Sequence, residues 1–263
     1  MRKISVTFPL LVIGHRGAAG HAPENTLAAF RRGLALGADG IECDVHMSRD
    51  GELVVIHDAT LERTTDGRGR VSDRTLGELK ALDAGSWYGP EFAGERVPTL
   101  AEVFAEVRAA EASSARARWC FVELKHGSDR YPGIEEKLVL AIAGSGLLER
   151  VAVISFDHGA IATIRAMAPT LRAGVLYDAR PVDSVGLALS AGASWIGPSV
   201  KWVNGPEVAQ ARSAGLEVFV WTANDPEGMR RVLELGVTAA GSDYPDRLLA
   251  LRDSGRFPAN NPN

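Results

Sequence analysis

The chain has 263 residues, of which 46% are hydrophobic and 24% charged, which is ample material for the core of a soluble globular protein. Its net charge of -4 argues against non-specific binding to nucleic acid or to an anionic membrane surface. No apolar run approaches the length of a transmembrane helix, so we expect a cytoplasmic protein without stable membrane association. The composition does not indicate an oligomeric state.

Two local features have simple structural interpretations. The basic residues at 1–3 and the apolar run after them resemble a signal peptide, but the run leads directly into His15 without a small-residue cleavage site. We interpret this run as the first strand. The two cysteines, Cys43 and Cys120, each share a strand-like run with a carboxylate, one residue from Glu42 and three residues from Glu123, so alternation turns them toward the opposite face. Buried, unreactive thiols are the favoured interpretation.

Strand-like apolar runs alternate with amphipathic segments along the chain. The predicted strands cover 10–13, 40–45, 120–124, 151–155, 172–176, 194–197, 217–221 and 238–242. The predicted helices cover 26–36, 100–108, 134–143, 160–166, 206–214 and 226–235. Glycines at 37, 192, 215 and 236 are typical of helix C-terminal ends. Eight strands that alternate with helices predict an α/β fold, a (β/α)8 TIM barrel.

One further strand, 53–56, does not fit the alternation. Only the short segment 47–52, which includes an Asp-Gly turn, connects it to the second barrel strand, and a parallel crossover needs a dozen or more residues. We therefore expect a hairpin that brings His57 over the barrel mouth. The polar segment 59–99 is too long for an ordinary loop and predicts a small insertion. The expected organisation is one domain over 1–253, with an inserted subdomain at about 59–99 and a frayed tail over 254–263.

Three carboxylates interrupt the buried strands. Glu42 and Asp44 lie two residues apart and share a face, and Glu123 repeats the arrangement in the next barrel strand. Inward carboxylates repel one another unless a cation neutralises them. An all-oxygen donor set without cysteine favours one hard divalent cation, Mg²⁺ or Ca²⁺, over Zn²⁺. The alternative is a salt-bridge cluster with Arg16 and Lys125.

Two histidines end strands beside these acids. His15 and His57 are candidates for proton transfer near neutral pH, and Arg16 and Lys125 are candidates for binding a phosphate. The other histidines have no comparable context, although those at 46 and 126 lie near enough to support the site. Trp221 either walls the substrate pocket or packs in the core.

Two further segments have open interpretations. Asn25 or Thr26 caps the first helix, while Glu24 and Asn25 are equally plausible in the site. Asp243 follows the last strand, where an orienting or capping role is favoured over metal ligation.

These residues occur in short motifs whose order along the chain is distinctive. The motifs are HRG at 15–17, PENT at 23–26, GIECDV at 40–45, VVIHD at 54–58, LERTTDGRG at 61–69, LDAGSW at 82–87, VPTLAE at 97–102, VELK at 122–125, VWTAN at 220–224 and SDYP at 242–245. Together they cover nearly the whole chain. The sequence resembles the bacterial glycerophosphodiester phosphodiesterase family.

The resemblance implies a barrel with a small inserted subdomain and a divalent ion held by Glu42, Asp44 and Glu123. It implies His15 and His57 as the acid–base pair. The implied reaction is hydrolysis of a glycerophosphodiester to sn-glycerol 3-phosphate and an alcohol such as choline or ethanolamine. Two alternatives stay open. One is a related barrel enzyme that acts on lysophospholipids. The other is a non-catalytic glycerophosphodiester-binding protein, which would be marked by loss of a histidine or metal carboxylate, and here all of them are present.

Overall fold

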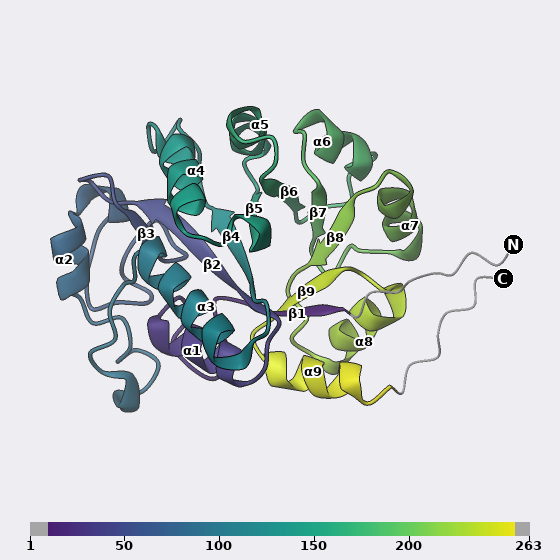
Figure 1. Ribbon diagram of the computed structural model, residues 1–263. Helices are drawn as coiled ribbons and strands as arrows, with labels where there is room; N and C mark the ends of the chain where they lie inside the picture. Colours follow the sequence, from purple (N-terminus) through teal and green to yellow (C-terminus); the bar gives the residue numbers. More distant parts are fainter. Residues whose placement is uncertain (1–9, 256–263) are drawn as a thin grey trace, which may run out of the picture.

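Eight parallel strands close into a barrel in the computed structural model, which describes residues 10–255. β1 pairs with both β2 and β9 and so closes the ring. The barrel strands are β1 Leu11–Gly14, β2 Gly40–Met47, β4 Trp119–Leu124, β5 Val151–Ser155, β6 Arg172–Tyr177, β7 Trp195–Pro198, β8 Glu217–Val220 and β9 Ala239–Ser242. The predicted (β/α)8 barrel is confirmed (Figure 1).

Helices cover the outside of the barrel between successive strands (Figure 1). They are α1 Leu27–Ala35, α3 Leu100–Ser114, α4 Ile134–Gly144, α5 His158–Met167, α6 Ser184–Ser190, α7 Gly205–Ser213, α8 Pro226–Leu235 and α9 Pro245–Asp253. The four glycines predicted at helix ends all have positive φ; Gly236 is itself the C-cap of α8, and the other three each follow the C-cap residue of their helix. Within residues 10–255 the helices are too short or too polar to cross a bilayer.

Three helices differ from the expectation. α3 continues six residues beyond the predicted end at 108, through a stretch rich in Ala that sustains a helix without an apolar stripe. α6 and α9 were not predicted. α6 has only seven residues and starts at an Asp183 cap, and α9 mixes charged residues with buried Leu248 and Leu249. Short or weakly amphipathic helices give little periodic signal.

Side-chain alternation divides the strands between two hydrophobic layers. One face packs against the helices, and there Cys43 and Cys120 are buried free thiols, as predicted. The other face fills the barrel, where Phe121 stacks on Phe219 with ring centroids 4.6 Å apart. Glu123 shares a strand face with Phe121, and alternation likewise turns Glu42 inward. The carboxylates therefore lie inside the barrel, toward the carboxyl ends of its strands.

β3, Leu53–Val55, pairs antiparallel with β2, so the predicted hairpin is confirmed. Its register places Val55 opposite Val45 and Leu53 opposite Met47. A further backbone hydrogen bond joins Ile56 N to Asp44 O at 3.0 Å. This bond fixes the chain beside Asp44 directly before His57.

The segment between β3 and α3 forms two 3-10 turns and one short helix: η1 Val71–Asp73, α2 Leu76–Ala81 and η2 Pro90–Phe92. It has its own small hydrophobic cluster, formed by Val54, Ile56, Leu61, Val71, Leu79, Ala84 and Val97. α2 lies away from the barrel in Figure 1. Of the expected frayed tail, 256–263 fall outside the described residues, as does the signal-like segment over 1–9.

Candidate active site

One pocket at the carboxyl ends of the strands brings together most of the predicted site residues. It is lined by His15, Arg16, Glu42, His57, Glu123, Lys125, Ile154, Phe156, Leu176, Phe219 and Trp221. The polar residues come from β1, β2, β4 and the end of the hairpin, and the apolar residues come from β5, β6 and β8. The pocket therefore has a charged half and an apolar half.

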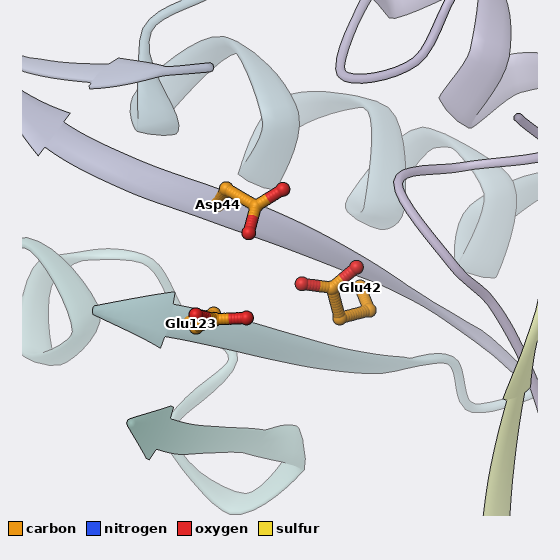
Figure 2. Close-up of side chains that lie close together, drawn as sticks. All are labelled: Glu42, Asp44 and Glu123. Atoms are coloured by element: carbon orange, nitrogen blue, oxygen red, sulfur yellow. The ribbon is translucent and has the colours of Figure 1, made fainter. Parts of the chain in front are cut away.

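The three carboxylates converge at the base of the charged half. Glu42 and Asp44 project from the same side of β2, and Glu123 faces them from the neighbouring strand β4 (Figure 2). All three are buried, and one oxygen from each lies within 4.8 Å of the others. Glu42 Oε1 is buried without a hydrogen bond. An unpartnered carboxylate oxygen inside a protein is costly unless it ligates a cation.

Arg16 is held against these acids from the loop after β1. Its backbone N–H donates to Glu42 Oε2 at 2.9 Å, its Nε lies 3.3 Å from Asp44 Oδ2, and its Nη1 donates to Glu24 Oε1 at 2.7 Å. Its φ of 51° lies in the left-handed region, which is unusual for arginine. Gly17 follows with φ 93°, and a Cβ there would lie 2.4 Å from the Ala29 backbone. The loop therefore requires glycine at this position.

Asn25 and Thr26 divide the two roles that the sequence left open. The Thr26 hydroxyl accepts from Ala29 N and so caps α1. The Asn25 amide instead donates to Asp44 Oδ2 at 2.7 Å and accepts from Asp44 N at 3.2 Å. Asn25 thus supports a site carboxylate.

Lys125 completes the charged half. Its Nζ donates to Glu123 Oε1 at 2.6 Å and lies 3.3 Å from Asp44 Oδ1. The side chain is mostly buried, and the surrounding carboxylates outweigh that burial to raise the pKa of Lys125. A fixed positive charge therefore faces the pocket beside the acids.

The acids differ in their tendency to ionise. Burial and the charges of Asp44 and Glu123 raise the pKa of Glu42 well above its ordinary value. Burial and Asp44 also raise the pKa of Glu123 to about 7, against the opposing charge of Lys125. Burial opposes ionisation of Asp44 too, but Lys125 and Arg16 outweigh it and hold the pKa of Asp44 below its ordinary value. Glu42 and Glu123 thus hold a proton more readily than an ordinary glutamate does, even with Arg16 and Lys125 beside them.

His15 is oriented by a carboxylate behind it. Its Nδ1 lies 2.6 Å from Asp243 Oδ1, and its Nε2 lies 4.0 Å from Glu42 Oε2. Asp243 is itself held by Asn224, whose Nδ2 donates to Oδ2 at 2.6 Å and whose Oδ1 accepts from Asp243 N at 2.8 Å. Asp243 therefore takes the orienting position that the sequence favoured.

His57 has a matching arrangement with a carboxylate of its own. Its Nδ1 lies 2.7 Å from Asp58 Oδ1, and Asp58 receives two hydrogen bonds from Arg63. Burial, with the charges of Arg16 and Lys125, lowers the pKa of His57 against the opposing effect of Asp44 and Asp58. The sequence did not single out Arg63, although it lies in the quoted 61–69 motif.

His46 supports His57 through the backbone. Its Nε2 lies 3.0 Å from His57 O, and its Nδ1 lies 2.7 Å from the Tyr131 hydroxyl. Burial lowers the pKa of His46 to about 4, so its ring is neutral at neutral pH. A neutral ring that donates from Nε2 accepts at Nδ1, which matches these two contacts. His46 is a structural support for the strand end that carries His57.

Trp221 lines the apolar half of the pocket and also packs against the core inside the barrel, so both of its predicted positions apply. Its ring packs edge-on against Phe156 with centroids 5.4 Å apart, and its Nε1 donates to Gly197 O at 2.8 Å. Phe219 lies below on the same strand face, and Phe156 is 46% exposed. This half offers no charged side chain and suits the carbon skeleton of a substrate.

Sequence comparison identifies relatives along nearly the whole chain. A sequence model described as the glycerophosphoryl diester phosphodiesterase family matches residues 15–247. A glycerophosphodiester phosphodiesterase of Caldanaerobacter subterraneus is 43% identical over 245 residues, which cover 93% of this chain and 98% of the relative. One from Bacillus subtilis is 35% identical over 255 residues, 90% of this chain and 84% of the relative.

Solved structures agree with this assignment. An Oleispira antarctica phosphodiesterase, solved in complex with the product sn-glycerol 3-phosphate, has a TM-score of 0.82 at 31% identity and covers 94% of this chain and 98% of its own. A glycerophosphodiester phosphodiesterase of Agrobacterium tumefaciens has a TM-score of 0.79 at 32% identity, and the match covers 92% of this chain and 99% of that structure's chain. The chain therefore belongs to the glycerophosphoryl diester phosphodiesterase family and is a phosphoric diester hydrolase.

Proposed function

We propose that this enzyme hydrolyses glycerophosphodiesters to sn-glycerol 3-phosphate and an alcohol, with a divalent cation and a pair of histidines. The observation that carries the proposal is the convergence of Glu42, Asp44 and Glu123 at a pocket that His15 and His57 both line. The product complex of the Oleispira antarctica relative supports the assignment of glycerol 3-phosphate.

The charged half of the pocket fits a divalent cation. Among residues 10–255, the three carboxylates face two side chains that carry a fixed positive charge, Arg16 and Lys125, and Arg16 also pairs with Glu24. The deficit of positive charge agrees with the raised pKa values of Glu42 and Glu123 and with the unpartnered Glu42 Oε1. A hard cation such as Mg²⁺ or Ca²⁺ matches carboxylate oxygens. When bound, the cation would screen the phosphate charge and lower the pKa of a ligating hydroxyl.

The two histidines are arranged for proton transfer. Each presents Nδ1 to a carboxylate, Asp243 for His15 and Asp58 for His57, which keeps the proton on Nδ1 and leaves Nε2 to exchange protons in the pocket. One histidine takes a proton from the attacking hydroxyl, and the other protonates the leaving alcohol oxygen. The pH–rate profiles of the two single alanine variants separate these roles.

The remaining residues bind and orient the diester. Arg16 and Lys125 stabilise the negative charge that develops on the phosphate oxygens. Trp221 and Phe219 hold the carbon skeleton in the apolar half. The nucleophile is either the substrate's own glycerol 2-hydroxyl, which gives a cyclic phosphate that water then opens, or water directly. Intramolecular attack has the advantage of a high effective molarity. A transient cyclic phosphate signal in ³¹P NMR distinguishes the first route.

The decisive assay measures glycerol 3-phosphate released from glycerophosphocholine with Mg²⁺, with Ca²⁺ and with EDTA. We expect metal-dependent release that His15→Ala abolishes. His21→Ala is the matched control, since His21 forms a similar histidine–carboxylate pair with Asp246 at 2.8 Å but does not line the pocket. Undiminished release in EDTA would contradict the metal proposal, and full activity of His15→Ala would contradict the histidine scheme.

A lysophospholipid is a second candidate substrate. Trp87 and Tyr88 are exposed aromatic residues of the inserted segment. Partial burial raises the pKa of Tyr88, and its neighbours Tyr244 and Asp243 raise it further, which places Tyr88 near the carboxylate that contacts His15. Such a surface beside the histidine end of the pocket could hold an acyl chain. Release of choline from lysophosphatidylcholine, without release from glycerophosphocholine, would favour this candidate.

A further inference from the structure

The guanidinium of Arg63 lies between two carboxylates, and each of these holds a different residue of the pocket. Arg63 donates two hydrogen bonds to Asp58 and two to Glu24, at distances from 2.7 to 3.0 Å. Asp58 contacts His57, and Glu24 contacts Arg16. Arg63 itself does not line the pocket.

On one side, Arg63 fixes the partner of His57. Asp58 Oδ2 accepts from Arg63 Nε at 2.7 Å, and Asp58 Oδ1 accepts from Arg63 Nη2 at 3.0 Å while it lies 2.7 Å from His57 Nδ1. This paired contact defines the plane of the carboxylate. The direction in which Asp58 Oδ1 meets the His57 ring is therefore set by Arg63.

On the other side, Arg63 fixes the partner of Arg16. Glu24 Oε2 accepts from Arg63 Nη1 at 2.8 Å, and Glu24 Oε1 accepts from both Arg63 Nη2 and Arg16 Nη1 at 2.8 and 2.7 Å. The Glu24 side chain is only 13% exposed, so it has little freedom to turn toward water. The same carboxylate oxygen thus joins the two guanidinium groups.

Only arginine fits this position chemically. Its planar group reaches both carboxylates with three nitrogens, whereas the lysine ammonium is a single point charge without a fixed fork. Removal of Arg63 would leave Asp58 and Glu24 without the cation between them. Both carboxylates would then repel each other and shift, and His57 and Arg16 would lose their fixed supports.

We propose that Arg63 is a positioning residue that sets the orientation of His57 and Arg16 together, through Asp58 and Glu24. The inference rests on the proposed roles of His57 in proton transfer and of Arg16 in phosphate binding. It gives the inserted segment a part in catalysis without contact with the substrate, because Arg63 lies between β3 and α3. Supporting residues of this kind commonly contribute about 10–100-fold to activity.

The test compares Arg63→Ala and Arg63→Lys with the wild-type enzyme in the glycerophosphocholine assay. We expect kcat/KM to fall about 10–100-fold in both, since the lysine retains the charge but not the paired hydrogen bonds. Guanidinium added in solution should partly restore Arg63→Ala and leave Arg63→Lys unchanged. The matched control is Arg31→Ala, which removes a similar forked arginine pair with Glu106 on the surface between α1 and α3.

Pairwise variants identify the route. If Arg63 acts through Asp58 and Glu24, the combined Arg63→Ala, Asp58→Asn variant should lose much less than the product of the two single losses. The same should hold for Arg63→Ala with Glu24→Gln. Independent, multiplicative losses would overturn the proposal, as would unchanged kcat/KM in both Arg63 variants.

A measurement without turnover separates this inference from the proposed function. The ¹⁵N NMR signals of the His57 ring, assigned with His57→Ala, report which nitrogen carries the proton. We expect a single Nδ1-protonated form in the wild type and a mixture in Arg63→Lys. An unchanged His57 spectrum in Arg63→Lys would overturn the positioning role. Full activity of His57→Ala would instead contradict the proposed role of His57 in proton transfer. The NMR comparison would still show whether Arg63 orients the His57 ring.

Discussion

Asn25 and Asp44 hold each other by two hydrogen bonds, from the Asn25 amide to Asp44 Oδ2 at 2.7 Å and from Asp44 N to Asn25 Oδ1 at 3.2 Å. Both residues are buried, and Asn25 adopts φ 58°, a left-handed conformation that asparagine tolerates better than most residues. The loop before α1 therefore sets the position of one carboxylate on the neighbouring strand.

Asn25→Ala should reduce both activity and stability. It removes both hydrogen bonds, leaves the buried Asp44 N–H unpaired, and places alanine at a positive φ that costs about 1 kcal/mol or more. We expect activity to fall about 10–100-fold. Asn25→Gly is the matched control because glycine accepts this φ without strain. Urea unfolding should show Asn25→Gly to be more stable than Asn25→Ala, while both stay impaired in the assay; equal stability would contradict the strain argument.

Glu123→Gln should weaken binding of the proposed cation. The change keeps the shape of the side chain and removes one of three negative charges, on which the affinity of carboxylate sites for hard cations depends. We expect Mg²⁺ or Ca²⁺ affinity, measured by calorimetry, to fall at least about 100-fold.

The control for this change is another buried glutamate, Glu135→Gln. Glu135 accepts hydrogen bonds from the Ser128 backbone and hydroxyl and does not line the pocket. The Glu135→Gln variant should bind Mg²⁺ or Ca²⁺ with the affinity of the wild type. Equal affinity in the Glu123→Gln variant would show that this carboxylate is not a ligand.

The sequence predicted the parts of the site that a single strand or loop defines. Glu42 and Asp44 were identifiable because charged residues interrupt an apolar strand, and period-two alternation places them on one face. The eight barrel strands were predicted to within two residues at each end for a similar reason, since apolar runs between helical segments mark buried strands.

The connections between distant segments could not be predicted in this way. Arg63 is 39 positions from Glu24 in the chain, and nothing in either local pattern indicates that they meet. The pairing of His15 with Asp243 spans 228 positions and depends on closure of the barrel by β1 and β9. Asn25 was ambiguous because a cap and a carboxylate support need the same short polar side chain.

Acid should loosen the inserted segment at Asp83. This carboxylate accepts backbone N–H groups of Gly85, Ser86 and Gly94 at 2.7–2.9 Å, and these bonds lower its pKa below the ordinary value. A lowered folded pKa means that the stabilisation is full above the ordinary carboxyl value of about 3.9 and is lost as the pH falls through the folded pKa.

Asp83→Asn isolates this effect. At neutral pH, amide hydrogen exchange at Ser86 and Gly94 should be faster in Asp83→Asn than in the wild type, since the ionised acceptor is gone. Amide exchange is intrinsically slow in acid, so the two proteins are compared at low pH by the NMR chemical shifts of the same amides. The chemical shifts of these amides in the wild type should approach those in Asp83→Asn as the pH falls and Asp83 takes up a proton. A difference that persists unchanged to the lowest accessible pH would contradict the role of Asp83 ionisation.

Asp39 ties three segments together at the amino end of the barrel, opposite the pocket. Its Oδ2 accepts from Val12 N at 2.9 Å and Arg252 Nη1 at 2.6 Å, and its Oδ1 accepts from Arg116 Nη2 at 2.8 Å. Asp39→Ala should lower the free energy of unfolding by about 2–4 kcal/mol, because it leaves a strand N–H without its acceptor and removes the carboxylate that Arg252 and Arg116 share.

Asp253→Ala is the matched control for Asp39→Ala, since Asp253 pairs with the same Arg252 but is 65% exposed. Asp253→Ala should lower the free energy of unfolding by less than about 1 kcal/mol. Both variants should keep wild-type kcat/KM at a temperature where they are folded, because neither side chain lines the pocket. Urea unfolding of the two proteins gives the comparison. Equal losses would mean that the pairing with Arg252, and not the link to Val12 and Arg116, stabilises this end of the barrel.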